Sequence, residues 1–469
     1  MKLQLFIFFL ICALGVQAKV KLPALVGDHM VLQRNAKVKV WGWARPGERI
    51  FVKGSWSGAS ARTIAGKDGK WNVSVRTLDA GGPYSMTIMG ENRINIKNIL
   101  FGEVWFCSGQ SNMEFTIKRL GGWDSKWYAN DAQKLKNYNT SNIRLFTVKR
   151  KISNTPVDDC EGNWAIARPD DIENFSATAW FFGLNLHEKL RIPIGLISSS
   201  WGGTGAEVWI PEEYGPRYDP DGWFESAPNK SKWWPGKPGV LYNGMVNPVL
   251  NYKIKGVIWY QGEANRKQAD RYVSMMETLA LSWRRAWRTR FPFYFVQIAP
   301  FNYKENKAGA LLREAQWEAS KVLSRSGMAV TMDIGEKDDI HPKNKQEVGH
   351  RLALLAMKKT YGNANVNAES PSFRRVKQEN GQLRIYFDNC TKLNANKATL
   401  EMFEVAAADK EFHKAEAKVE GNTIVVRSAM VKEPVAVRFA FENFAVAKLL
   451  NEHDLPASSF RSDEWLVEE

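Results

Sequence analysis

The spacing of apolar and polar positions changes along the 469-residue chain, and each change marks a different kind of structure. Residues 19–100 contain short runs in which apolar and polar residues alternate, such as KVKVWGWA and KWNVSV, separated by Pro-Gly, Asp-Gly and Gly-Gly turns. Alternation with a period of two is typical of strands that bury one face. This segment predicts an N-terminal module that is a small antiparallel β-sandwich.

Residues 101–362 combine continuous apolar runs with longer amphipathic segments. Strands that alternate with helices form a parallel sheet with helices on both faces, and its buried strands are apolar throughout. We therefore expect an α/β domain of three layers. The expected strands lie in ILFGEVWFC and at 193–200, 255–262, 291–300 and 328–335, and the expected helices lie at 176–190, 270–287 and 343–362.

Two further segments complete this organisation. Residues 213–240 are rich in Pro, Gly and Trp and interrupt the alternation of strands and helices, so they predict a long surface loop inserted in the α/β domain. After a polar linker near 363–371, short strand-like runs return. Residues 372–469 therefore predict a C-terminal β-rich module.

The first 18 residues, MKLQLFIFFLICALGVQA, have a basic start, an apolar centre and a small residue at the end. This is the pattern of a secretory signal peptide with its cleavage site. The apolar centre is shorter than the about 20 residues that a membrane span requires. We expect an exported protein, periplasmic or secreted, that makes no stable membrane insertion.

The formal net charge of +15 and the 19 tryptophans indicate the kind of partner. Basic residues are scattered, and no zinc-finger, homeodomain or RNA-recognition pattern accompanies them, so we do not expect nucleic acid as a partner. A positive net charge favours attraction to acidic glycans. Flat aromatic faces also stack on sugar rings. The composition therefore favours a carbohydrate over a nucleic acid.

The stretch GEVWFCSGQSNMEF places Ser111 just after the first strand of the α/β domain. One interpretation is a helix capping box, in which the Ser111 hydroxyl bonds to the Glu114 amide. The other is a nucleophile, because ligands of open parallel sheets bind at the carboxyl ends of the strands, and a helix start there favours developing negative charge. The two interpretations compete for one rotamer, and we expect the hydroxyl to face a catalytic base.

The chain has six histidines, and His341 is the one in a loop, DDIHPKNK, that follows an expected strand. An aspartate three residues earlier, Asp338, can bond the inner ring nitrogen while the outer nitrogen faces Ser111. Such a carboxylate fixes the tautomer and stabilises the imidazolium that forms. The sequence therefore predicts a catalytic triad of Ser111, His341 and Asp338.

Donors for an oxyanion follow two other strands, in addition to the Ser111 amide. In SSSWGGTGAE, Gly202 and Gly203 can bring a bare amide close, although an ordinary strand-to-loop turn is the alternative. In WYQGEAN, Gln261 lies nearest the strand end and is our preferred side-chain donor. Asn265 either caps the next helix or contacts the substrate.

Glu263 in the same stretch is either a second acid or a buried hydrogen-bonding residue of the turn. No cluster of His, Cys and carboxylate residues has the spacing of a metal site. No glycine-rich phosphate or dinucleotide loop opens a helix either. We therefore expect neither a metal nor a cofactor.

Five motifs together resemble one family: GEVWFCSGQSNME, SSSWGGTGAEVW, LYNGMVNPVL, KGVIWYQGEAN and DDIHPKNK. They are similar to those of the sialate O-acetylesterase family, a carbohydrate-esterase branch of the SGNH (GDSL-like) hydrolases, and the flanking modules match as well. The resemblance implies a secreted serine esterase with an SGNH-type domain that removes O-acetyl groups from sugars. It implies Ser111 as nucleophile, His341 as base, Asp338 as its orienter, and Ser111, Gly203 and Gln261 in the oxyanion hole.

An acetylated glycan is the partner that this resemblance implies, and acetylated sialic acid is our leading substrate. Similar proteins act on plant polysaccharides, so an esterase for acetylated xylan or pectin is the alternative. A non-catalytic sugar-binding protein is a second alternative. The sequence has no signal for an oligomeric state. Candidate sugar contacts, each with a purely structural role as the alternative, are Asn265, Arg313, Gln316, Trp233 and Trp234.

Overall fold

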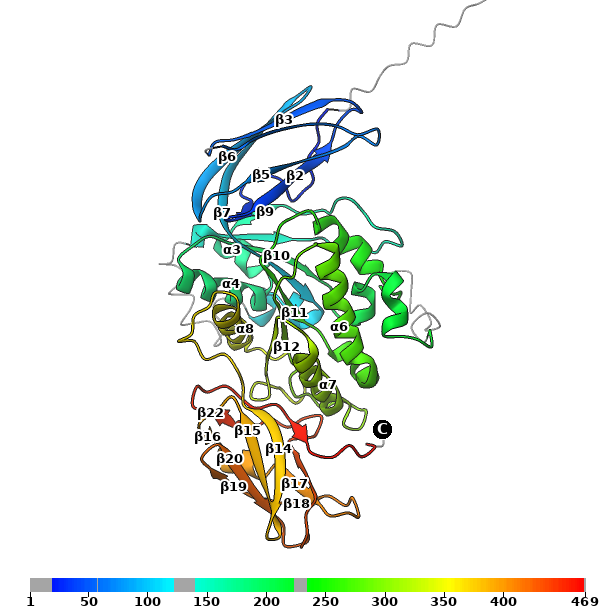
Figure 1. Cartoon of the computed structure of the whole chain (residues 1–469), viewed down its shortest axis with the longest axis vertical. Coiled ribbons are helices and arrows are strands. Elements are labelled where there is room, and N and C mark those ends of the chain that lie inside the picture. Colours follow the sequence, from blue (N-terminus) through cyan, green and yellow to red (C-terminus); the bar gives the residue numbers. More distant parts are fainter. Residues whose placement is uncertain (1–18, 57, 122–139, 223–233, 468–469) are drawn as a thin grey trace, which may run out of the picture.

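The computed structural model describes residues 19–56, 58–121, 140–222 and 234–467. Figure 1 shows three parts along the long axis of the molecule: N-terminal strands, a central region of strands and helices, and C-terminal strands. The expected signal peptide, residues 1–18, lies outside the described residues. Within the described ranges, no helix is both long and apolar enough to span a bilayer.

A parallel sheet forms the centre of the molecule, with strand order β13-β12-β11-β7-β10-β8-β9. All neighbours from β13 to β8 are parallel, and β9 runs antiparallel to β8 at one edge. The expected parallel sheet is confirmed, and β8 and β9 are additions to it. The strands are β7 (Arg93–Gly109), β8 (Ile143–Thr147), β9 (Trp164–Ile166), β10 (Ile194–Ser200), β11 (Gly256–Tyr260), β12 (Phe293–Val296) and β13 (Ser326–Ala329).

Helices cover both faces of this sheet (Figure 1). Successive strand residues point to opposite faces, so Trp105 belongs to one hydrophobic core and Phe106 to the other. Each large side chain so buried contributes about 1.5–3 kcal/mol to the stability of the fold. The helices α4 (Ala177–Leu190) and α8 (Lys345–Lys359) share the core of Trp105, and α6 (Ala269–Ala286) and α7 (Ala308–Val322) share the core of Phe106.

One long strand, β7, joins the N-terminal strands to the central sheet. Its first half pairs with β1 (Val31–Gln33) and β6 (Gly81–Met89), and its second half pairs with β10 and β11. The expected domain boundary at residue 100 therefore falls within a continuous strand. The other N-terminal strands are β2 (Lys37–Trp43), β3 (Arg49–Gly54), β4 (Ser60–Ile64) and β5 (Lys70–Arg76), all in antiparallel pairs.

The C-terminal part contains antiparallel sheets, as the return of short alternating runs predicts. The sheets have the orders β14-β15-β20-β19, β18-β17-β21-β23 and β16-β22. Their strands are β14 (Ser372–Glu379), β15 (Gln382–Asp388), β16 (Leu393–Asn394), β17 (Phe403–Ala406), β18 (His413–Lys414), β19 (Glu416–Glu420), β20 (Thr423–Arg427), β21 (Ala436–Phe439), β22 (Leu450–Asn451) and β23 (Phe460–Arg461).

The last central strand differs from the expected one at 328–335. β13 ends at Ala329, and the two buried residues Val330 and Met332 belong to the hydrophobic core of the C-terminal sheets instead. The Met332 carbonyl accepts a hydrogen bond from the Ala447 amide at 3.0 Å. One apolar run thus serves two cores, and the chain leaves the sheet before it reaches the loop of His341.

Candidate active site

The turn after β7 brings Ser111 to the carboxyl edge of the sheet. Gly109 has a φ of +141°, and a Cβ atom on it would lie 2.1 Å from the Tyr260 carbonyl oxygen of the neighbouring strand. Only glycine fits such a close approach of two backbones. The short helix α1 (Ser111–Glu114) begins directly after this turn, with Ser111 half-buried.

The capping box that the Ser-x-x-Glu pattern suggests is not formed. Gln110 occupies the cap position, and its carbonyl accepts the Glu114 amide at 2.9 Å. The Glu114 carboxylate instead accepts hydrogen bonds from Arg150 and from the Gly202 amide at 3.0 Å. Neither the hydroxyl nor the amide of Ser111 makes a hydrogen bond to another residue in the described part of the chain. Both groups are therefore available to a substrate.

Contacts of its neighbours bring the His341 loop to α1. The Asn112 side-chain amide donates to the Ile340 carbonyl at 3.1 Å, and the Phe115 and His341 rings lie with their centroids 5.2 Å apart. The Ser111 hydroxyl and the His341 ring, both described, share no hydrogen bond in this structure. In ligand-free enzymes this bond is often long, and it tightens when substrate binds.

The carboxylate that contacts His341 in this structure belongs to Asp339, whereas the sequence predicts Asp338. The Asp339 Oδ1 atom accepts the His341 amide at 2.9 Å and lies 3.4 Å from the His341 Nδ1 atom. A short aspartate side chain readily accepts the amide two residues on, and this local turn directs the carboxylate to the ring. Asp338 is exposed.

The His341 ring is set to be neutral near pH 7. Burial lowers the pKa of His341 below its usual value, and the positive charges of Lys345 and Arg119 lower it further, while Asp339 raises it. A neutral imidazole can accept the proton of a serine hydroxyl. The electrostatics of the loop therefore suit a general base.

The two glycines after β10 lie against the Ser111 turn. A Cβ atom on Gly202 would be 3.2 Å from the Ser111 Cβ atom, but the Gly202 amide is occupied by Glu114. Gly203 has a φ of +72° and is exposed, and its amide bonds to none of the described residues. The indole of Trp234 covers Gly203, 2.8 Å from where its Cβ would be. The assignment of Gly203 to the oxyanion hole stays a prediction.

Gln261 and Asn265 are both buried, and their side chains have hydrogen-bond partners within the fold. Gln261 is fully buried, and its amide donates to the Thr204 carbonyl at 3.1 Å, to Gln110 at 3.2 Å and to Asn265 at 2.7 Å. Its oxygen accepts the Tyr272 hydroxyl at 2.9 Å. Asn265 is 1% exposed. An amide whose hydrogens are already donated cannot stabilise an oxyanion, so both residues support the fold.

Two other candidate sugar contacts, Arg313 and Gln316, are buried within the fold. Arg313 is fully buried and donates to the Ser459 hydroxyl at 3.1 Å and to the Glu442 carbonyl, so it ties α7 to the C-terminal part. Gln316 is also fully buried, and its hydrogen bonds go to backbone groups. Trp233 lies outside the described residues. The structural alternative therefore holds for Arg313 and Gln316.

A hollow of about 280 Å³ lies beside α1, at the carboxyl ends of β8 and β10. Polar residues in its lining include Glu114, Thr116, Asn174, Ser198 and Ser200. Such hydroxyl and amide groups match the hydroxyl groups of a sugar. Glu114 of α1 lines this hollow, whereas Ser111 does not.

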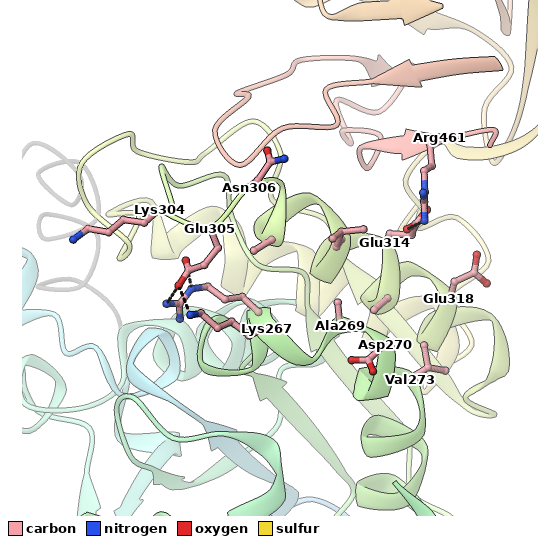
Figure 2. Close-up of a pocket in the computed structure, with 14 residues that line it drawn as sticks. Lys267, Ala269, Asp270, Val273, Lys304, Glu305, Asn306, Glu314, Glu318 and Arg461 are labelled. Carbon is pink, nitrogen blue, oxygen red and sulfur yellow. Dashed lines mark hydrogen bonds and ion pairs between the residues drawn. The ribbon is translucent and has the colours of Figure 1, made fainter. Parts of the chain in front are cut away.

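A larger cavity, about 710 Å³, lies between the N-terminal halves of α6 and α7 (Figure 2). Its rim is charged, and several of the charges are paired: Arg266 and Lys267 contact Glu305, and Arg461 contacts Glu314. Neither Ser111 nor His341 lines it. The larger cavity is therefore separate from the candidate site of Ser111 and His341.

Lys345 lies next to this site and was not among the residues expected from the sequence. Lys345, at the start of α8, is fully buried, and its ammonium donates to the Asn112 side-chain oxygen. A signal for it exists in the sequence, because Lys345 shares the i, i+3, i+7 stripe of Val348 and Leu352, which are both buried. A lysine within an apolar stripe indicates a buried charge with partners.

Comparisons with known proteins show which family the chain resembles. Residues 102–358 match the family described as carbohydrate esterase, sialic acid-specific acetylesterase. The chain is 29% identical to the sialate O-acetylesterase of Mus musculus over 78% of this chain and 79% of that protein. The human sialate O-acetylesterase is 28% identical over 75% of this chain and 73% of that protein.

A solved structure is also similar over almost the whole chain. The crystal structure of a carbohydrate acetylesterase from Xanthomonas citri has a TM-score of 0.85 and 33% sequence identity, and the match covers 95% of this chain and all of that one. With the family match over more than half of the chain, this likeness identifies the enzyme class. The chain belongs to the sialic acid-specific acetylesterase family of carbohydrate esterases and is a carbohydrate acetylesterase.

Proposed function

We propose that the protein is an exported sialate O-acetylesterase in which Ser111 is the nucleophile, His341 the general base and Asp339 the carboxylate that orients it. The observation that carries the proposal is the meeting of the Ser111 turn with the His341 loop at the carboxyl edge of the sheet, through Asn112 and Ile340. A serine hydroxyl needs such a base to become nucleophilic.

In the first step, the Ser111 hydroxyl attacks the acetyl carbonyl of the sugar ester while the His341 ring takes its proton. The negative oxygen of the tetrahedral intermediate rests on the Ser111 and Gly203 amides, which are the donors near the nucleophile without a described partner. Asp339 stabilises the imidazolium. The C–O bond to the sugar then breaks, and the sugar hydroxyl leaves with the proton from His341.

In the second step, water attacks the acetyl group on Ser111. The His341 ring, now neutral, takes a proton from this water, and the intermediate again places its charge on the two amides. Collapse returns the proton to the Ser111 oxygen and releases acetate. The cycle needs no group beyond this chain, the ester and water.

Two features favour acetylated sialic acid over an acetylated plant polysaccharide. The curated relatives at 28–29% identity are named sialate O-acetylesterase. The net charge of +15 attracts the carboxylate of a sialic acid, whereas a xylan backbone is neutral; pectin also carries carboxylates, so this feature argues against xylan alone. The hollow beside α1 offers hydroxyl and amide groups to a sugar. Xylan or pectin esterase activity is the alternative.

The expected signal peptide supports export, and it is tested directly by N-terminal sequencing of the protein recovered outside the cytoplasm. A mature chain that begins at Lys19 agrees with the proposal. A protein that keeps Met1 through Ala18 after purification from such a fraction contradicts it.

The function is tested by acetate release from acetylated sialic acid, xylan and pectin. The wild type should have its highest kcat/KM on the sialic acid, and Ser111→Ala should lose about 10,000-fold or more. Ser108→Ala is a matched control, because the Ser108 hydroxyl is buried and has no described hydrogen-bond partner. A higher kcat/KM on xylan or pectin would favour the alternative substrate, and equal rates for wild type and Ser111→Ala would exclude the nucleophile.

A further inference from the structure

Lys345 has an environment that is unusual for a lysine. It lies at the first position of α8, and its side chain has no exposed surface. Lysines are almost never fully buried unless their charge has partners, because desolvating an ammonium is costly. Partners of the Lys345 charge must therefore offset the cost of burying it.

The ammonium of Lys345 is held by one amide and two aromatic rings. Its Nζ atom donates to the Asn112 Oδ1 atom and lies 5.2 Å from the Tyr260 ring centroid and 5.7 Å from that of Phe115. A cation near the face of an aromatic ring is attracted by the ring quadrupole. Asn112 and Phe115 belong to the segment of the proposed nucleophile.

The opposite side of Asn112 is held by a carboxylate. The Asn112 Nδ2 atom donates to the Glu263 Oε1 atom at 2.6 Å and to the Ile340 carbonyl at 3.1 Å. Glu263 is 3% exposed. An ammonium can only donate and a carboxylate can only accept, so the two charges together fix which way the Asn112 amide faces.

This fixed amide connects the two halves of the proposed site. Asn112 follows Ser111 in the chain, and Ile340 precedes His341, so the bond between Asn112 and Ile340 sets the distance between nucleophile and base. If Lys345 lost its charge, Asn112 could turn and this bond would weaken. A misplacement of about 1 Å in such a site can cost about 100-fold in rate.

The charge of Lys345 also acts on the base. The charged groups that face His341 are Lys345, Arg119 and Asp339: the two cations lower the pKa of His341 and the carboxylate raises it. Burial lowers the pKa of Lys345 itself to about 7, against the carboxylates of Glu263, Asp339 and Glu336, which raise it. When it carries its proton, Lys345 opposes protonation of the base.

We propose that Lys345 is a positioning residue of the esterase: together with Glu263 it locks the Asn112 amide so that Ser111 and His341 keep their separation, and its charge keeps the His341 ring neutral. This role rests on the proposed assignment of Ser111 and His341. Lys345 contacts no substrate and acts through Asn112 and through its field.

The test compares Lys345→Met, which removes the charge at similar volume, with Lys345→Met/Glu263→Gln, which removes both buried charges and so avoids an unbalanced carboxylate. Lys358→Met is the matched control, because Lys358 lies on the same helix in a half-exposed ion pair with Glu369. Steady-state acetate release is measured from pH 5 to 8 for each folded protein, with Ser111→Ala in parallel.

We expect both Lys345 variants to lose about 10- to 100-fold in kcat with little change in KM. The acid limb of kcat/KM should move to higher pH, because the charge that opposed protonation of His341 is gone. Lys358→Met should behave as the wild type. An acid limb that does not move in either Lys345 variant overturns the inference, whatever happens to stability. Activity retained by Ser111→Ala instead overturns the proposed function itself.

Discussion

The turn after β7 and the turn after β11 leave neighbouring strands of the central sheet at the same edge. Both are rich in polar residues, GQSN in one and QGEAN in the other. Ser111 in the first is half-buried, and its hydroxyl bonds to none of the described residues. Gln261 in the second is fully buried and bonds to Gln110, Thr204, Asn265 and Tyr272.

The difference fits the proposed roles of the two turns, a reacting group in the first and a supporting residue in the second. A group that acts on a substrate must keep hydrogen-bonding capacity that the folded protein does not use. A buried polar side chain must have that capacity filled, or it destabilises the fold. Substitutions in the two turns should therefore divide into those that change rate and those that change stability.

The largest effect is expected from the base that serves the first turn. His341→Ala should lower kcat/KM about 10,000-fold, as Ser111→Ala does, because the members of such a triad act as a unit. The double variant should lose little more than either single variant. Acetate release under single-turnover conditions measures this, and a double variant whose losses multiply would contradict joint action.

The next effect distinguishes the two aspartates of the His341 loop. Asp339→Asn should reduce kcat about 100- to 10,000-fold, because the carboxylate no longer holds the ring tautomer or stabilises the imidazolium. Asp338→Asn, at an exposed neighbour, should stay within about twofold of wild type. A larger loss of kcat in Asp338→Asn than in Asp339→Asn would contradict this assignment and support Asp338 as the orienting carboxylate.

The second turn should respond in stability. Gln261→Leu leaves buried partners such as the Thr204 carbonyl and the Tyr272 hydroxyl without their hydrogen bonds, and we expect a loss of about 2–4 kcal/mol in the free energy of unfolding. Ser111→Ala should change it by no more than about 0.5 kcal/mol. Urea denaturation of both variants provides the comparison. If Gln261→Leu keeps its stability but loses its activity, the result would support Gln261 as an oxyanion donor.

The smallest effect concerns the pH dependence of the base. Activity requires a neutral His341 and is lost as the pH falls through its pKa, so the lowered pKa places the acid limb of kcat/KM below pH 6.5. Arg119→Gln removes one of the cations that lower this pKa and should move the limb upward. Because Arg119 is exposed, added salt should shrink the difference. A wild-type limb above pH 6.5 would contradict the assigned environment.

Much of the fold could be predicted because continuous apolar runs and amphipathic segments identify buried parallel strands and their helices. β8 was missed because it is a short strand that contains Arg144, a charged residue that is nevertheless 3% exposed. β13 was shifted because Val330 and Met332 pack into the C-terminal core. Which of two cores receives an apolar residue depends on contacts that are distant in sequence.

The site was predictable only in part, for a related reason. Ser111 and His341 could be proposed from the sequence because each lies in a loop beyond a strand end. Asp338 and Asp339 are adjacent, and a single bond to the His341 amide decides which of them reaches the ring. The burial of Gln261 depends on partners such as Thr204, which is 57 residues away. Contacts between residues so far apart in the chain cannot be read from the sequence alone.

The claim that Ser111 forms the covalent intermediate is tested most directly by labelling. The wild type is treated with a fluorophosphonate, a reagent that phosphonylates activated serines, and the digested protein is mapped by mass spectrometry. We predict an adduct on Ser111, protection by acetylated substrate, and no adduct in His341→Ala, where the serine lacks its base. The account would be contradicted by an adduct on another serine that forms at the same rate as the enzyme loses activity.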